Sequence, residues 1–162
     1  MSAASGLALG IDIGSTTAKV VLVEDGKILY ENYQRHFSQV RQKTLELLAE
    51  AAPYAGDRPL MAAISGSAGL GLAESAGVSF VQEVFATGEV VRRLEPDAAA
   101  VVELGGEDAK IIFFEGGIDE RMNGSCAGGT GAFIDQMATL LKVTPAEMDQ
   151  LAEKAQRAYT IA

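Results

Sequence analysis

The only cysteine of the chain, Cys126, lies in a glycine-rich stretch between Met122 and Phe133. Apolar side chains recur at helical spacing from Phe133 to Leu141, so this stretch leads directly into a predicted helix. A helix N-terminus directs free N–H groups and the positive end of its dipole at the residues before it, which stabilises a thiolate or an anionic metal cluster. Cys126 is therefore a candidate metal ligand. The alternative is a small buried apolar residue, because one cysteine alone does not make a metal site.

A short polar turn follows the first apolar run of the chain. Residues 7–13 predict a buried strand, residues 18–23 predict a returning strand, and the turn between them consists of Gly14, Ser15, Thr16 and Thr17. A glycine lets backbone N–H groups approach phosphate oxygens closely, and the hydroxyl groups add further donors. Asp12 at the strand end can hold Mg²⁺ through water, and Lys19 brings a positive charge to the same turn. The turn is thus a candidate phosphate site, with an ordinary polar hairpin as the alternative.

A similar arrangement recurs in the second half of the chain. Residues 98–104 predict a strand with Glu103 near its end, and Gly105 and Gly106 follow directly. Two further strands are predicted at 109–114 and 118–122. We expect the two acid-plus-glycine hairpins to face each other across one phosphate group, with Mg²⁺ and the nucleotide tail between them. Two unrelated glycine-rich turns are the alternative.

Four motifs, taken in order, resemble those of a known family. They are Asp12–Lys19, Glu83–Ala86, Glu103–Lys110 and Met122–Gly131. Together they look like the ATP-dependent activators of 2-hydroxyacyl-CoA dehydratases, which belong with the benzoyl-CoA reductase ATPase subunits in the superfamily of actin, Hsp70 chaperones and sugar kinases. The resemblance covers nearly the whole chain, and the cysteine motif separates this family from the rest of the superfamily.

The resemblance implies a function for each motif. Such activators are homodimers that carry one [4Fe-4S] cluster between the subunits, and ATP binding and hydrolysis drive a low-potential electron to the dehydratase or reductase. By this resemblance, Cys126 matches one cluster ligand and Glu83 is a candidate for orienting the attacking water. The phosphate loops, which would hold ATP or ADP, match Asp12, Gly14, Ser15, Thr16 and Thr17, followed by Glu103, Gly105 and Gly106.

The chain also departs from the family pattern. The family usually has Asp where this chain has Glu103, Gln at Glu107 and His at Thr87, and it usually has Asn-Asp-Lys where residues 123–125 are Asn-Gly-Ser. A second cysteine is expected beyond the helix that follows the first. One cysteine per chain gives two thiolates per dimer, short of the usual four, so we do not expect this stretch by itself to hold the cluster.

The end of the chain predicts a helix with a strong start. Thr144 to Glu147 form a capping box with proline at the first helical position, and the helix is expected to run to about Tyr159. The chain then ends without a closing strand, which favours the first part of a longer protein, with a naturally short protein as the alternative. In this interpretation, residues 1–122 form an actin-like ATPase lobe, and residues 123–162 are the cysteine loop and the helices that begin a second lobe.

The remaining segments alternate between strands and helices. The expected elements are an Asp25-Gly26 type I′ hairpin before a strand at 27–33, a helix over about 40–51 with Ser38 as N-cap, a strand at 60–64 and a helix at 82–94. This order predicts an α/β fold, an RNase H-like lobe with a mixed β-sheet flanked by helices. His36, the only histidine, is expected at the surface rather than as a ligand.

Composition and charge argue against several classes of function. The net charge of −9 argues against binding to nucleic acid or acidic membranes, and no apolar run reaches transmembrane length. The N-terminus lacks the features of a signal peptide, and one cysteine excludes an internal disulfide framework, so the cytoplasm is the expected compartment. Two alternatives stay open: a small-molecule kinase of the same superfamily, and a non-catalytic nucleotide-binding module.

Overall fold

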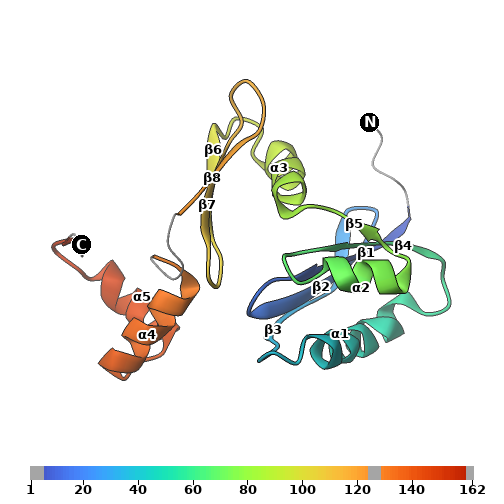
Figure 1. Ribbon diagram of the computed structural model, residues 1–162, viewed down its shortest axis with the longest axis horizontal. Helices are drawn as coiled ribbons and strands as arrows, with labels where there is room; N and C mark the ends of the chain where they lie inside the picture. Colours follow the sequence, from blue (N-terminus) through green and yellow to red (C-terminus); the bar gives the residue numbers. More distant parts are fainter. Residues whose placement is uncertain (1–5, 124–128, 160–162) are drawn as a thin grey trace.

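Five strands form one mixed sheet in the computed structural model, which describes residues 6–123 and 129–159 (Figure 1). Their order across the sheet is β3-β2-β1-β4-β5, with the bounds β1 (Leu7–Ile13), β2 (Thr17–Glu24), β3 (Lys27–Arg35), β4 (Leu60–Ser65) and β5 (Ser79–Phe80). The first three strands are joined as antiparallel hairpins, whereas β4 runs parallel to both β1 and β5. The parallel pairs need crossover connections, and helices supply them.

The main core lies between this sheet and two helices on one of its faces, α1 (Val40–Ala55) and α2 (Leu70–Ala76). Because side chains alternate along a strand, every second residue of β1 and β2 faces these helices. Ile13, Val20 and Leu47 are almost completely buried there. Burial of each such side chain contributes about 1.5–3 kcal/mol. The packing therefore fixes the end of β1, where the first glycine turn begins.

A second sheet, antiparallel throughout, follows along the chain. Its order is β6 (Ala100–Leu104), β7 (Ala109–Phe113) and β8 (Asp119–Met122). Helix α3 (Glu83–Leu94) connects the two sheets, and α4 (Gly131–Leu141) and α5 (Pro145–Glu153) come after the second sheet (Figure 1). In the described ranges, no helix is both long enough and apolar enough to cross a membrane. The division of the chain between residues 122 and 123 stays a prediction.

Several expectations from the sequence are confirmed. The fold is α/β, with a mixed five-stranded sheet flanked by helices. Asp25 and Gly26 form a two-residue hairpin turn with positive φ angles of 48° and 80°, as a type I′ turn requires. Thr144 and Glu147 form the expected capping box at the start of α5. The hydrogen bonds from the backbone N–H and hydroxyl of Thr144 lower the pKa of Glu147, because they stabilise its ionised form.

Other expectations are wrong, each for a local reason. Ser38 is not the N-cap of α1, which is Gln39; Ser38 lies one residue before it with a positive φ of 64°. Helix α5 ends at Glu153 rather than near Tyr159, and none of its residues is buried, so no packing supports a longer helix. The sequence analysis missed α2 and β5, which are short and bury Ala73 alone between them.

Candidate functional site

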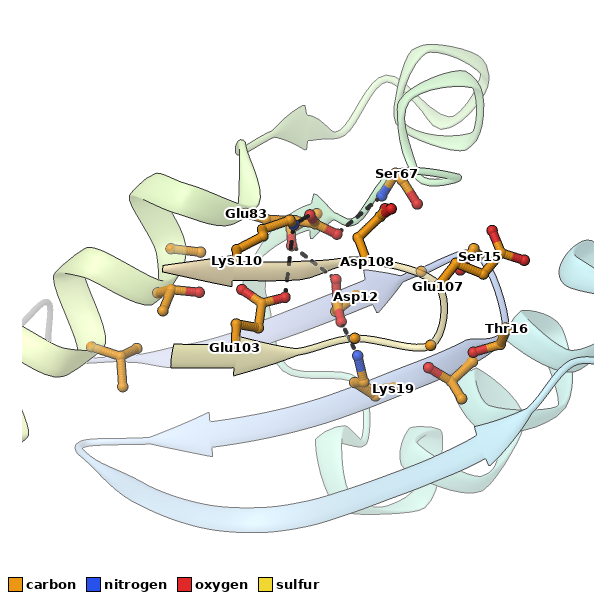
Figure 2. A pocket seen from close by; sticks show the side chains of 18 of the residues that line it. Asp12, Ser15, Thr16, Lys19, Ser67, Glu83, Glu103, Glu107, Asp108 and Lys110 are labelled. Carbon is orange, nitrogen blue, oxygen red and sulfur yellow. Dashed lines mark hydrogen bonds and ion pairs between the residues drawn. The ribbon is translucent and has the colours of Figure 1, made fainter. Parts of the chain in front are cut away.

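The turns that follow β1 and β6 meet at one open cleft of about 390 Å³ (Figure 2). The positions that the sequence analysis assigned to nucleotide, magnesium or catalysis all line this cleft: Asp12, Gly14, Ser15, Thr16, Thr17 and Lys19 from the first hairpin, Glu103, Gly105 and Gly106 from the second, and Glu83 from the start of α3. Glu107 and Asp108, at the tip of the second hairpin, also line it. Cys126 lies outside the described residues.

The two glycine turns are closed in the same way. The N–H of Gly14 donates to the carbonyl oxygen of Thr17 at 2.9 Å, and the N–H of Gly105 donates to the carbonyl oxygen of Asp108 at 2.8 Å. In both hairpins an acid on the first strand is the register partner of a lysine on the second. These pairs are Asp12 with Lys19 and Glu103 with Lys110. The two hairpins are therefore structural repeats of one strand–turn–strand unit.

The turns approach each other closely because Gly106 has no side chain. A Cβ atom at Gly106 would lie 2.3 Å from Oγ1 and 2.9 Å from Cγ2 of Thr16. Helix α4 is attached to the second turn, since the N–H groups of Gly131 and Ala132 donate to the carbonyl oxygens of Gly105 and Gly106, each at 2.9 Å. The spacing of the two turns and the start of α4 are thus fixed together.

The carboxylates of the cleft have defined partners. Asp12 forms an ion pair with Lys19 (Figure 2). It also accepts a hydrogen bond from the Ser65 hydroxyl at 3.1 Å. Glu83 accepts a hydrogen bond from the Ser67 N–H at 3.2 Å. Both carboxylates are therefore held in position before any ligand binds.

Lys110 joins the acids of α3 and β6. Its ammonium forms an ion pair with Glu83, and its Nζ lies 3.7 Å from Oε1 of Glu103 (Figure 2). The Lys110 side chain is 10% exposed. Burial alone would lower the pKa of Lys110, but the hydrogen bond to Glu83 and the charges of Glu103, Glu83 and Glu120 outweigh it, so the pKa is raised. Lys110 is therefore a fixed positive charge between two carboxylates.

Glu103 carries an unsatisfied atom. Its Oε2 is buried and has no hydrogen-bond partner within the described ranges. A buried carboxylate oxygen without a donor is costly, so this atom suits a cation or a hydrated cation. No group of three or more His, Cys, Asp or Glu side chains that could hold a metal is found in the described part of the chain.

Sequence reasoning gave no role to Lys110, although the chain carries a signal for it. The lysine follows its acid at the same interval in both hairpins, as Asp12 to Lys19 and as Glu103 to Lys110. The surface position expected for His36 is also wrong: the residue is buried, with 4% exposure, and its ring contacts the Gly14 carbonyl of the first turn. A buried imidazole needs hydrogen-bond partners, and the first turn supplies one. The spacing of apolar residues along the sequence does not reveal such a contact.

One sequence family matches nearly the whole chain. The sequence profile of the BadF/BadG/BcrA/BcrD ATPase family matches residues 9–162. The (R)-2-hydroxyglutaryl-CoA dehydratase activating ATPase of Acidaminococcus fermentans is 28% identical over 157 residues, which are 94% of this chain and 60% of that protein. The activator of lactoyl-CoA dehydratase of Anaerotignum propionicum is 31% identical over 151 residues, or 91% of this chain and 58% of that protein.

Solved structures show the same fold. Component A of the Acidaminococcus fermentans (R)-2-hydroxyglutaryl-CoA dehydratase superposes with a TM-score of 0.80 at 27% identity, over 98% of this chain and 62% of that chain. The activator of the 2-hydroxyisocaproyl-CoA dehydratase from Clostridium difficile, with bound ADPNP, superposes with a TM-score of 0.79 at 23% identity, over 97% and 60%. The fold is that of the actin-like ATPases. The chain spans about 60% of the length of the curated relatives it matches.

Proposed function

Because the chain belongs to the BadF/BadG/BcrA/BcrD ATPase family, we propose that it is the ATP-binding and ATP-hydrolysing part of an activator that drives low-potential electron transfer. The electron acceptor would be a dehydratase of 2-hydroxyacyl-CoA substrates or a reductase of the benzoyl-CoA reductase type. One observation carries the proposal: two acid-plus-glycine turns and Glu83 line a single cleft. The similarity to activating ATPases of 2-hydroxyacyl-CoA dehydratases supports the choice of partner.

The phosphates of ATP or ADP would lie between the two turns. The first turn offers the hydroxyls of Ser15, Thr16 and Thr17, and the Gly105–Gly106 backbone faces it across the cleft. Mg²⁺, when bound, would supply charge neutralisation at the phosphate oxygens. Asp12 and Glu103 would hold it, and the buried Oε2 of Glu103, which has no hydrogen-bond partner among the described residues, supports this assignment.

Hydrolysis would depend on Glu83. Its carboxylate stands at the N-terminus of α3 and is fixed by the Ser67 N–H on one oxygen and by the Lys110 ammonium on the other. A carboxylate fixed in this way can accept a hydrogen bond from the attacking water and orient it. Lys110 keeps Glu83 in place and offsets part of the negative charge of the cleft.

The electron-transfer part of the proposal rests on Cys126. A [4Fe-4S] cluster shared by a homodimer through the Cys126 region would supply the one-electron chemistry, and Cys126 would be one ligand. The single cysteine gives two thiolates per dimer, so the residues of this stretch do not complete the cluster on their own. Helix α4, which begins just after the cysteine segment, is hydrogen-bonded to Gly105 and Gly106, and this supports a link between cleft and cysteine.

Iron content tests the cluster assignment. We expect about four irons and a similar amount of acid-labile sulfide per dimer in the anaerobically purified complete gene product, because a [4Fe-4S] cluster has that composition. The Cys126→Ala variant should lose them. Unchanged iron in Cys126→Ala would remove Cys126 from the ligand set, and iron-free wild-type protein would leave only the ATPase part of the proposal.

The contact between the turns gives a second test. We expect Gly106→Ala to weaken Mg-ATP binding by about tenfold or more, because the added Cβ meets Thr16 and separates the turns that are proposed to hold the phosphates. Calorimetric titration of the complete gene product with Mg-ATP measures the effect. Gly71→Ala is the matched control, since its Cβ would meet nothing within 4 Å. Equal affinity of the Gly106→Ala variant and wild type would contradict the prediction.

A further inference from the structure

His36 is a buried polar side chain that the proposed chemistry does not use. It follows β3 directly, and its side chain is only 4% exposed. The ring nitrogen Nε2 lies 3.0 Å from the carbonyl oxygen of Gly14, and Nδ1 accepts a hydrogen bond from the N–H of Ser38 at 3.2 Å. A backbone N–H can only donate, so Nδ1 is unprotonated here. Nε2 therefore carries the proton and donates it to Gly14.

The backbone of His36 contacts the same turn. Its N–H donates to the carbonyl oxygen of Thr16 at 3.1 Å. Two carbonyl groups of the first glycine turn are thus bonded to one residue, which lies behind the turn and not among the residues that line the cleft. Both carbonyl oxygens, with their partial negative charge, are therefore engaged by a residue outside the cleft lining.

The two residues after His36 have a strained backbone. Phe37 and Ser38 both have positive φ angles, 46° and 64°, which are unfavourable for residues with a Cβ, above all for a bulky one. The Phe37 side chain is 77% exposed, so burial of its ring does not stabilise this conformation. Instead, the hydrogen bonds of His36 to Gly14, Thr16 and Ser38 stabilise this conformation of the loop. A strained backbone held by polar contacts is typical of functional sites.

We propose that His36 is a positioning residue for the first phosphate loop: its Nε2–H holds the Gly14 carbonyl away from the cleft, so that the turn presents its N–H groups and hydroxyls to a polyphosphate. The inference rests on the proposed function, because it assumes that the turn binds the phosphates of a nucleotide. It assigns to His36 no contact with the nucleotide itself.

Three substitutions separate positioning from packing. His36→Gln places an amide NH₂ near the position of Nε2 and keeps a donor for Gly14. His36→Asn reaches only as far as Nδ1, so it keeps a partner for Ser38 and loses the bond to Gly14. His36→Leu loses both. Phe37→Ala is the matched control, because it alters an exposed side chain of the same loop.

The experiment is titration of each complete gene product with Mg-ATP, alongside thermal unfolding and the kcat and KM of ATP hydrolysis. We expect His36→Gln and Phe37→Ala to bind within about threefold of wild type, and His36→Asn to bind about tenfold more weakly, with the loss in KM rather than kcat. His36→Leu should lose at least as much as His36→Asn, and the comparison of Gln with Asn stands even if the Leu variant does not fold.

Two results would overturn the inference while the proposed function survives. One is wild-type affinity in His36→Asn. The other is a loss of affinity in His36→Gln that merely follows a loss of thermal stability, which would mark a packing role. Wild-type protein that binds no Mg-ATP would instead overturn the proposed function, and the inference with it.

Discussion

Replacing Glu83 with Gln is expected to lower the rate of ATP hydrolysis by about 100-fold or more, with Mg-ATP affinity changed only a few-fold. The substitution keeps the shape of the side chain and removes its charge. A neutral amide loses the ion pair with Lys110 and orients a water poorly as an acceptor, whereas the turns proposed to bind the phosphates are unaltered. Single-turnover hydrolysis by the complete gene product measures the effect.

Glu89→Gln is the matched control for this experiment. Glu89 lies on the same helix, is exposed, and pairs with Arg93 on the helix surface. An exposed pair of this kind contributes little to stability, so this variant should hydrolyse ATP like wild type. If Glu83→Gln hydrolyses ATP as fast as Glu89→Gln, the water-orienting role belongs to another residue.

Replacing Gly66 with Ala is expected to destabilise the protein by about 3 kcal/mol or more. The Cβ atom would lie 2.2 Å from the carbonyl oxygen of Ile13, and the other nearest atoms are also backbone of Ile13. That carbonyl already accepts a hydrogen bond from Ala68, and Gly66 has a φ of +95°, which disfavours any side chain. The Ile13 backbone cannot move away from the added Cβ atom, because Ile13 is completely buried at the end of β1.

Urea unfolding followed by circular dichroism measures this loss, with Gly71→Ala beside it. Gly71 lies in α2, and a Cβ there would meet nothing within 4 Å. We expect Gly71→Ala to stabilise the protein by about 0.5–1 kcal/mol, since alanine loses less conformational entropy than glycine in a helix. Equal unfolding midpoints for the two variants would show that the β4–α2 turn can relax, contrary to the geometry.

The sequence predicted those parts of the site that consist of short, local motifs. Asp12 and the glycine turn after it, and Glu103 with its own glycine pair, could be recognised because strand alternation and turn residues are local signals. That both turns line one cleft depends on the tertiary structure. In the sequence, only the similarity of the two motifs suggested it. The role proposed for each residue stays a prediction.

His36 and Lys110 show why the rest could not be predicted. The environment of each is set by a contact with a residue distant in the sequence: His36 contacts Gly14, and Lys110 contacts Glu83 on another element. Residue type and spacing alone make a lone histidine after a strand resemble a surface residue. Burial among backbone carbonyls is decided by the path of the loop, which two positive φ angles at Phe37 and Ser38 redirect.

The charge of the cleft bears on which form of a nucleotide it would admit. Its lining carries five carboxylates, Asp12, Glu83, Glu103, Glu107 and Asp108, against the two ammonium groups of Lys19 and Lys110. This imbalance repels a free polyphosphate anion and attracts a divalent cation, since fields of one sign are focused inside a concave surface. A nucleotide that arrives already paired with its counterion meets a much smaller electrostatic barrier. If the cleft binds nucleotide as proposed, the same acidic residues would favour entry of the nucleotide as its magnesium complex over entry of the free anion.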